Sequence, residues 1–155
     1  MKSLLGTNRV IKMKKIAVDS MIFIYHFEQN GDFSESVLKI LSGARDGGHK
    51  LITSTVSIIE TLSAPKYAEL DEVVAEIRTF FEEAEFLEVL VMNGEIALET
   101  ARLRRENPAL RTSDAIQLAT AIVAGAEVFI TGDTKLKNIK IRGLEIKLLE
   151  PAHST

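Results

Sequence analysis

Short apolar runs that alternate with longer amphipathic segments constrain the fold of this chain more than any other feature. Five runs have the length and apolar content of short strands: 15–18, 50–54, 86–92, 128–131 and 145–149. Strands that alternate with helices of about ten or more residues are typical of a parallel sheet covered by helices. We therefore predict an α/β fold, a three-layer α/β/α sandwich with a mainly parallel central sheet.

The segments between these runs have helical periodicity and recognisable ends. We predict helices at 20–28, 34–45, 56–63, 94–105 and 112–124, and an amphipathic pattern at 68–85. Gly47-Gly48 and Gly125 follow two of these helices, as glycines at helix ends commonly do. Pro65 stops a third, because proline disfavours helical geometry in the residue before it.

The chain has the size of one compact domain. It contains 155 residues, of which 46% are hydrophobic and 26% charged, and it has no repeat, linker or low-complexity tract. We therefore predict a single domain over 1–155. Because Met13-Lys14-Lys15 would make a natural start before the first strand, we interpret residues 1–12 as a flexible arm or as an artefact of an upstream start site.

The composition excludes several kinds of site. The chain has no cysteine, so disulfides and thiolate metal sites are ruled out, and His26, His49 and His153 are too scattered to suggest a zinc cluster. No apolar run approaches the roughly 20 residues that span a bilayer, and the first 15 residues lack the apolar centre of a secretory signal. We expect a cytoplasmic protein that does not bind membranes.

Four acids stand at places where α/β proteins bind ligands. In open parallel sheets, ligands bind beyond the carboxyl ends of the strands, near the point where the strand order reverses. Asp19 directly follows the first strand, and Asp133 follows the fourth after Gly132, which is expected to let the backbone turn sharply. Asp114 begins the last helix, and Glu60 lies about one turn into the helix after the second strand.

Each acid also has a purely structural interpretation. Asp19 and Asp133 would cap the helices that follow them, and Asp114 would complement the positive end of its own helix, effects worth about 0.5–2 kcal/mol. Glu60 is harder to explain in this way. The helical face that it shares with Ile59 is expected to meet the core, where a bare carboxylate is costly. The structural alternative for Glu60 is a salt bridge to a lysine or arginine.

The four carboxylates together indicate a metal site. Like charges on one rim repel one another and raise each other's pKa, so we expect a cation between them. Mg²⁺ or Mn²⁺ suits a site built from carboxylates without histidine or cysteine. Such an ion lowers the pKa of a bound water and stabilises charge on a departing phosphate oxygen. The set therefore predicts metal-assisted phosphodiester hydrolysis.

Four stretches of the sequence resemble the PIN (PilT N-terminal) domain family. They are Val18-Asp19-Ser20, then 53–60 (TSTVSIIE) with Pro65 after it, then 112–119 (TSDAIQLA), and 129–133 (FITGD). The similarity extends over 14–150 and is greatest to the small toxins of the VapC type. It implies a PIN-like nuclease domain that acts as an Mg²⁺-dependent endoribonuclease, with Mn²⁺ as a substitute. It also implies the toxin of a type II toxin–antitoxin pair, a homodimer inhibited by a cognate antitoxin.

The resemblance also implies roles for the acids. The four acidic positions of the family correspond to Asp19, Glu60, Asp114 and Asp133, which are the catalytic and metal-binding residues we predict. We expect the three aspartates to share a metal ion, directly or through water. We expect Glu60 to orient a water or to complete the shell of the ion.

Two hydroxyl residues match the family, and two other positions depart from it. Ser20 and Thr112 occupy places beside the acids where outer-shell hydrogen bonds orient a ligand. Met21 stands where the family often has a small polar residue, and Leu136 stands where an aromatic residue is frequent. These departures affect the preference for a substrate more than the binding of a metal.

An acidic protein needs local positive charge to bind RNA. The net charge of this chain is -3, so nothing in its overall charge favours a nucleic acid. Basic residues nevertheless precede Asp114 and follow Asp133, where they could hold phosphates: Arg102, Arg104, Arg105, Arg111, Lys135, Lys137, Lys140 and Arg142. The alternative for any one of them is a solvated helix face.

Two other functions stay open. A housekeeping PIN-domain nuclease in RNA processing would have the same active site. A noncatalytic acidic metal-binding module, such as a phospho-acceptor receiver domain, also clusters acids on a parallel sheet. A receiver needs an aspartate after its middle strand, whereas 86–92 is followed by Asn93-Gly94.

Two helical segments are more apolar than one buried stripe requires. They are 23–27 and 73–81, and both carry several large apolar residues. This excess fits either deep burial or an interface, which the toxin resemblance would assign to the antitoxin or to a second copy of the chain.

Overall fold

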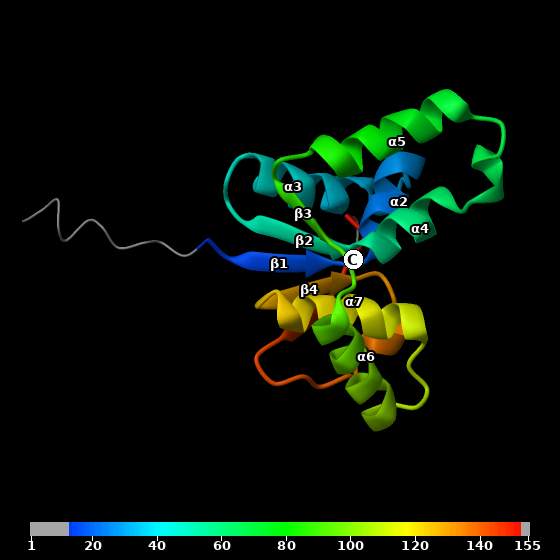
Figure 1. Ribbon diagram of the computed structural model, residues 1–155. Helices are drawn as coiled ribbons and strands as arrows, with labels where there is room; N and C mark the ends of the chain where they lie inside the picture. Colours follow the sequence, from blue (N-terminus) through cyan, green and yellow to red (C-terminus); the bar gives the residue numbers. More distant parts are fainter. Residues whose placement is uncertain (1–12, 153–155) are drawn as a thin grey trace, which may run out of the picture.

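The computed structural model describes residues 13–152 (Figure 1). Its strands are β1 (Lys15–Val18), β2 (Lys50–Ser54), β3 (Leu87–Leu90), β4 (Val128–Thr131) and β5 (Glu145–Leu148). Its α-helices are α2 (Ser20–Glu28), α3 (Ser34–Arg45), α4 (Thr55–Leu62), α5 (Asp71–Glu83), α6 (Gly94–Glu106) and α7 (Thr112–Val123), and two 3₁₀ turns are η1 (Pro65–Tyr67) and η2 (Thr134–Leu136). Residues 1–12, interpreted above as an arm or a start-site artefact, lie outside the described residues.

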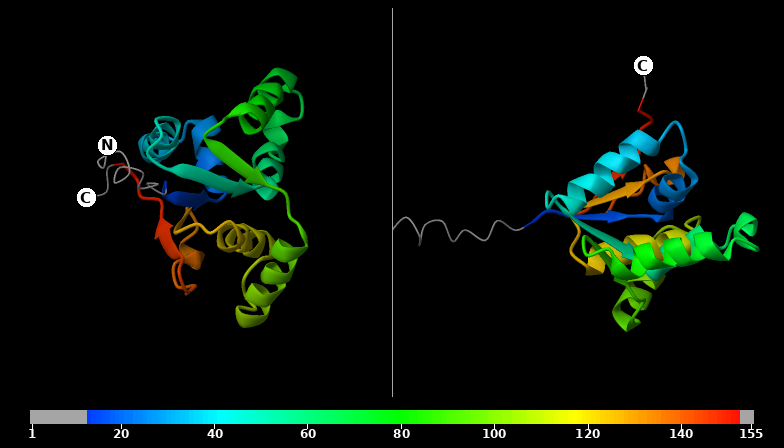
Figure 2. Two further views of the ribbon diagram at one scale, coloured as in Figure 1. Left: turned by 60° about the vertical axis from the view of Figure 1, so that its left-hand side comes forward. Right: turned by 90° about the horizontal axis from the view of Figure 1, so that it is seen from above.

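The five strands form one sheet in the order β3-β2-β1-β4-β5. Every neighbouring pair is parallel, and Ala17 of β1 lies level with Ile52 of β2 and Phe129 of β4. Helices α6 and α7 cover one face of the sheet, while α2, α3 and α5 cover the other (Figures 1 and 2). The predicted three-layer sandwich is confirmed, and its sheet is parallel throughout.

The core has one apolar layer on each face of the sheet. Ile52, Phe129 and Leu118 belong to the layer under α6 and α7, and Phe23 and Ile77 belong to the layer under α2, α3 and α5. Consecutive strand residues point to opposite faces, which is why the strands of a sheet covered on both sides read as continuous apolar runs. Among the helices described in residues 13–152, none is both long enough and apolar enough to cross a lipid bilayer.

Several of the apolar side chains of segments 23–27 and 73–81 form an aromatic cluster between α2 and α5. The ring centroids of Phe23 and Phe81 lie 4.9 Å apart, and those of Phe27 and Phe80 lie 5.2 Å apart at an interplanar angle of 87°. Edge-to-face contacts of this kind are the favoured geometry of aromatic pairs. Burial therefore accounts for Phe23, Ile77 and Phe81, while Phe27 and Phe80 are only partly buried.

The predicted strand 86–92 is too long at both ends. The observed β3 stops at Leu90, and Val91 is 72% exposed. The strand lies at the edge of the sheet with β2 as its only neighbour, and the chain turns away toward α6, where Asn93 Oδ1 accepts a hydrogen bond from the backbone N of Ile96 at 2.9 Å. This cap fixes the helix start and removes residues 91–92 from the sheet.

A buried polar network joins the elements that carry three of the four acids. Gln117 Nε2 on α7 donates to Ser57 Oγ on α4 at 2.9 Å, and Ser57 Oγ lies 2.7 Å from Thr53 Oγ1 on β2. The Thr53 hydroxyl donates to the carbonyl oxygen of Val18, the residue before Asp19, at 2.8 Å. Because buried polar groups are costly unless they are paired, this chain of contacts sets the spacing of α7, α4 and β1.

Candidate active site

Two of the acids lie on either side of the point where the strand order reverses. Asp19 follows β1 and Asp133 follows β4, and these are neighbouring strands from which the chain proceeds in opposite directions across the sheet. The backbone N of Asp19 donates to the carbonyl oxygen of Ile130 at 3.2 Å, which ties the end of β1 to β4. Open α/β sheets bind ligands at this position.

All four predicted acids line one cavity of about 330 Å³ at this edge of the sheet. Each comes from a different element: Asp19 from the end of β1, Glu60 from α4, Asp114 from α7 and Asp133 from the turn after β4. The remaining lining residues are Ser20, Met21, Ile24, Arg111, Gly132 and Thr134. The structure thus brings together residues that are up to 114 positions apart.

Asp19 is the most deeply buried of the four, with 5% of its surface exposed. Its Oδ1 accepts a hydrogen bond from the backbone N of Met21 at 3.0 Å, and its Oδ2 accepts one from the hydroxyl of Thr131. Burial is the main cause that raises the pKa of Asp19 to about 7 in spite of these two hydrogen bonds, and the neighbouring charges of Asp114 and Glu60 contribute to the rise. A cation beside this carboxyl would favour its ionised form.

The surroundings of Glu60 differ from the sequence prediction. The face that Glu60 shares with Ile59 was expected to meet the core, but Ile59 is 62% exposed, so that prediction is wrong. The buried residues of α4 are Ser57 and Thr61, small hydroxyl side chains that allow close packing, and Glu60 faces the cavity instead. Among residues 13–152 Glu60 makes no salt bridge, and its Oε1 accepts a hydrogen bond from Ser20 Oγ at 2.9 Å.

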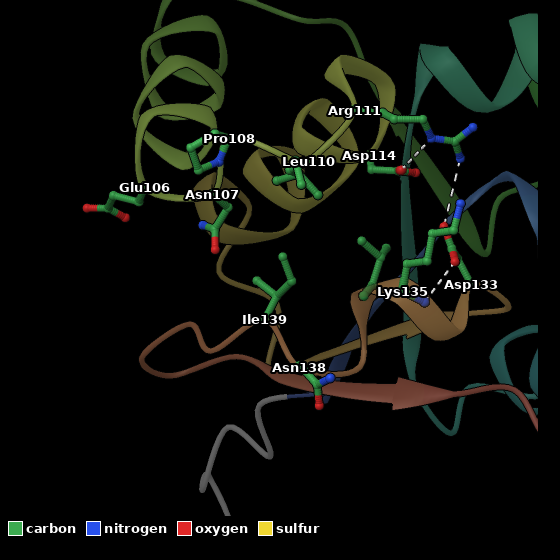
Figure 3. Close-up of a pocket in the computed structure, with 12 residues that line it drawn as sticks. Glu106, Asn107, Pro108, Leu110, Arg111, Asp114, Asp133, Lys135, Asn138 and Ile139 are labelled. Atoms are coloured by element: carbon green, nitrogen blue, oxygen red, sulfur yellow. Dashed lines mark hydrogen bonds and ion pairs between the residues drawn. The ribbon is translucent and has the colours of Figure 1, made fainter.

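Arg111 is the positive group of this cavity. Its Nε lies 3.0 Å from Asp114 Oδ2 and its Nη2 lies 3.8 Å from Asp133 Oδ2, so one guanidinium spans two acids (Figure 3). The hydrogen bond to Asp114 is the main cause that raises the pKa of Arg111, with smaller contributions from the charges of Asp133 and Glu60. The side chain of Arg111 is 68% exposed and reaches the acids from the solvent side.

The capping interpretation of Asp19 and Asp133 is also correct and does not conflict with a site. Asp133 Oδ1 accepts from the backbone N of Lys135 at 2.9 Å, much as Asp19 Oδ1 accepts from Met21. In both residues the cap uses Oδ1 alone. The second oxygen faces another group, Thr131 for Asp19 and Arg111 for Asp133.

Gly132 combines the predicted turn with a close packing contact. The backbone bends at Gly132 directly after β4, as predicted. Its φ is outside the positive range, so the bend does not use the left-handed conformation that favours glycine. A Cβ at position 132 would lie 3.1 Å from Met21 Cε and 3.2 Å from Met21 Cβ. Glycine therefore also leaves room for Met21.

The donor set fits a hard divalent cation, but the four acids do not form a ready-made cage. Within residues 13–152, no three acidic or histidine side chains are close enough together to hold an ion as they stand. The carboxylates surround a cavity in which the Arg111 guanidinium supplies positive charge, and Asp19 is buried at a cost that a cation would offset. Carboxylate oxygens in this number match the preference of Mg²⁺ and Mn²⁺.

The two predicted hydroxyl residues have different surroundings. Ser20 lines the cavity and donates to Glu60. Thr112 begins α7, is exposed and is not among the residues that line this cavity. The sequence analysis did not identify Thr131, whose hydroxyl also accepts a hydrogen bond from the backbone N of Asp133 at 3.0 Å and so links two of the acids. Its place at the carboxyl end of β4, beside β1, was the available signal.

Comparison with protein families identifies one match. The sequence profile of the PIN domain matches residues 16–141. The curated proteins include no match. VapBC2 of Rickettsia felis, solved with a DNA fragment from its promoter, is 16% identical with a TM-score of 0.68, over 88% of this chain and 99% of that chain.

Two other solved structures have the same fold. VapC20 of Mycobacterium tuberculosis, a toxin that cleaves the sarcin–ricin loop, is 11% identical with a TM-score of 0.65, over 84% of this chain and 98% of that chain. A toxin–antitoxin complex from Klebsiella pneumoniae is 23% identical with a TM-score of 0.62, over 83% and 94% of the two chains. At these identities the likeness is one of fold.

Proposed function

The chain belongs to the PIN domain family, and from that premise we propose that it is an Mg²⁺-dependent endoribonuclease, the toxin of a type II toxin–antitoxin pair. The observation that carries the proposal is the single cavity lined by Asp19, Glu60, Asp114 and Asp133 at the carboxyl ends of β1 and β4. Metal-assisted hydrolysis needs carboxylates to hold an ion and no nucleophilic side chain. The toxin–antitoxin proteins among the structural neighbours support the biological role.

The four acids share two tasks in the proposed reaction. When bound, a divalent ion lowers the pKa of water and offsets the negative charge that develops on the phosphate. Asp19, Asp114 and Asp133 hold that ion, directly or through water. Glu60 orients the attacking water, and its own position is fixed by the hydrogen bond from Ser20.

Thr131 is a positioning residue in this proposal. Its hydroxyl donates to Asp19 Oδ2 and accepts from the backbone N of Asp133, so it holds the carboxyl of Asp19 in register with the turn that carries Asp133. Outer-shell partners of this kind orient metal ligands. Asp19 and Asp133 therefore keep a constant separation because both are tied to the end of β4.

Among the described residues, few basic side chains lie close to the acids. Arg111 lines the acidic cavity, and Lys135 lies beside Asp133 (Figure 3). Arg102, by contrast, pairs with Glu99 and Glu106 along α6, which supports the alternative of a solvated helix face for that residue. We propose that Arg111 and Lys135 bind RNA phosphates, and that the protein acts in the cytoplasm as a homodimer regulated by its cognate antitoxin.

Release of Arg111 from the acids is expected to accompany metal binding. Replacing Arg111 by Met should tighten Mn²⁺ binding by up to about fivefold. The metal ion then no longer competes with the guanidinium for the carboxylates, and an exposed ion pair of this kind is worth roughly 0.2–1 kcal/mol. Isothermal titration calorimetry with Mn²⁺ measures this effect. Arg105→Met, at an exposed position on α6, is the control. Unchanged or weaker Mn²⁺ binding by Arg111→Met would show that Arg111 does not occupy the place of the cation.

Growth arrest separates a toxin from a housekeeping nuclease. Induced expression of the parent chain in a bacterial host is expected to stop growth, and the Asp133→Asn variant at equal protein level is expected to allow it. Co-expression of the small protein encoded next to the toxin should restore growth. Normal growth with an active, well-expressed parent chain would favour a role in RNA processing.

A further inference from the structure

A second cavity opens beside the acidic one. Its volume is about 540 Å³, and it lies between the turn that joins α6 to α7 and the segment that follows Asp133 (Figure 3). It shares Arg111, Asp114 and Asp133 with the acidic cavity, so the two adjoin at these three side chains. A molecule held at the acids can therefore extend directly into the second cavity.

The middle of the second cavity has an apolar lining. Leu110 and Leu136 are 5% and 2% exposed and form part of it, with Ile139 beside them. The backbone N of Leu110 donates to the carbonyl oxygen of Asn107 at 2.9 Å, and the backbone N of Ile139 donates to that of Leu136 at 3.1 Å. A local turn therefore shapes the chain on each side of the cavity.

The polar groups of the cavity are divided between its two ends. Arg111 and Lys135 lie beside Asp114 and Asp133 at one end, Asn107 lies beside Pro108 toward the other, and Asn138 lies next to Ile139 on the opposite wall (Figure 3). Glu106 also lines the cavity. A ligand with phosphate at one end, a flat apolar body and hydrogen-bonding edges at the other matches this arrangement.

We propose that this cavity binds the nucleoside attached to the phosphate that the acids cleave. The inference rests on the proposed function, because a phosphodiester placed at the acids carries a nucleoside on each side. An unpaired base fits between Leu110, Leu136 and Ile139, and its edge would be read by Asn138, an exposed residue that lines the same cavity. RNA-binding proteins read unpaired bases through such edge contacts. Arg111 and Lys135 then face the phosphate, which favours a nucleotide over an apolar side chain of a protein partner.

Nucleoside monophosphates test this site without requiring cleavage. We expect AMP, GMP, CMP or UMP, added to ¹⁵N-labelled protein in Mg²⁺ buffer, to shift the backbone amides of Leu110, Asn138 and Ile139. Ribose 5-phosphate lacks a base and is expected to shift mainly Arg111 and Lys135. Equal shifts from the two kinds of ligand, or base-dependent shifts located elsewhere, would overturn the proposal and leave the cavity to a protein partner.

A variant that fills the cavity tests its use by RNA. Ala109 lines the cavity and is exposed, so a tryptophan at this position should fill the cavity. We expect Ala109→Trp to weaken nucleotide binding about tenfold and to raise the KM for RNA about tenfold. Binding of Mn²⁺ should be unchanged. Ala75→Trp, at an exposed position of α5, is the matched control. Asn138→Ala alters only an exposed side chain and should reduce discrimination between bases.

The outcomes for the two proposals are distinguishable. Unchanged KM and nucleotide affinity in Ala109→Trp would overturn the nucleoside site, while metal-dependent cleavage by the parent would leave the proposed function intact. Absence of cleavage by the parent, together with base-dependent shifts at Leu110, Asn138 and Ile139, would overturn the ribonuclease and support a nucleotide-binding cavity.

Discussion

Replacing Asp114 by Asn is expected to lower metal-dependent RNA cleavage by about 10³-fold, equivalent to about 4 kcal/mol of transition-state stabilisation. Asp114 lines the acidic cavity, and its Oδ2 is the oxygen that Arg111 contacts at 3.0 Å. Asparagine keeps the size of the side chain but removes the charge that would hold the ion. Initial rates on a mixed RNA substrate, measured in Mg²⁺ with purified protein, give the size of the loss.

The control for Asp114→Asn must lose the same charge at the same kind of helix position. Asp71→Asn meets this requirement, because Asp71 stands in the first turn of α5 as Asp114 stands in the first turn of α7. Both variants lose a favourable interaction with the helix dipole, which is worth about 0.3–1 kcal/mol. We expect both to fold, with full cleavage by Asp71→Asn alone. Undiminished cleavage by a folded Asp114→Asn variant would contradict the role of the acid.

Removal of divalent cations is expected to abolish cleavage completely. Within residues 13–152, no histidine and no lysine line the acidic cavity. The hydroxyls of Ser20 and Thr134 therefore have no histidine beside them in this cavity to act as the general base of a catalytic triad. In the proposed mechanism an ion therefore generates the nucleophile. Treatment with EDTA followed by gel filtration should stop cleavage, and addition of Mg²⁺ or Mn²⁺ in excess should restore it.

Thermal denaturation tests the binding of the ion independently of cleavage. Binding to the folded state raises the midpoint temperature by mass action, so Mn²⁺ should raise it in the parent chain. Repulsion among the four carboxylates is relieved at the same time. A parent protein that cleaves RNA at full rate in EDTA, with no shift of the midpoint on adding Mn²⁺, would rule out the metal mechanism.

The fold could be predicted because its signals are local. The five strands are short apolar runs, the helices have their own periodicity, and predicted and observed bounds agree exactly for α2, α3, β1, β2 and β4. The error at β3 has a tertiary cause. Residues 91 and 92 are apolar in sequence, but the edge position of the strand and the Asn93 cap turn them into an exposed connection.

The convergence of the acids could also be inferred, because parallel strands end at one edge of the sheet. Asp19 and Asp133 are placed there by the alternation of strands and helices alone. The orientation of Glu60 could not be inferred in the same way, since apolar residues on its helical face suggested burial. Which face of α4 is buried depends on the contact between Ser57 and Gln117, 60 positions away.

Contacts between side chains that are far apart in the sequence could not be predicted. Thr131 contacts Asp19 across 112 positions, and this contact depends on the pairing of β4 with β1. Arg111 was predicted to hold phosphate, and its ion pairs with Asp114 and Asp133 depend on how the start of α7 lies against the turn after β4. The turn at Gly132 was predicted, but its close approach to Met21 on another element was not.

The most direct test is cleavage of mixed RNA by the parent and by Asp19→Asn, each assayed in Mg²⁺ and in EDTA. Asp19 is chosen because it is the most buried acid and is held by Thr131 and by the backbone of Met21. We predict cleavage in one of the four reactions, the parent with Mg²⁺, while circular dichroism shows that both proteins are folded. Equal Mg²⁺-dependent cleavage by the two proteins would contradict the assignment of this cavity as the active site.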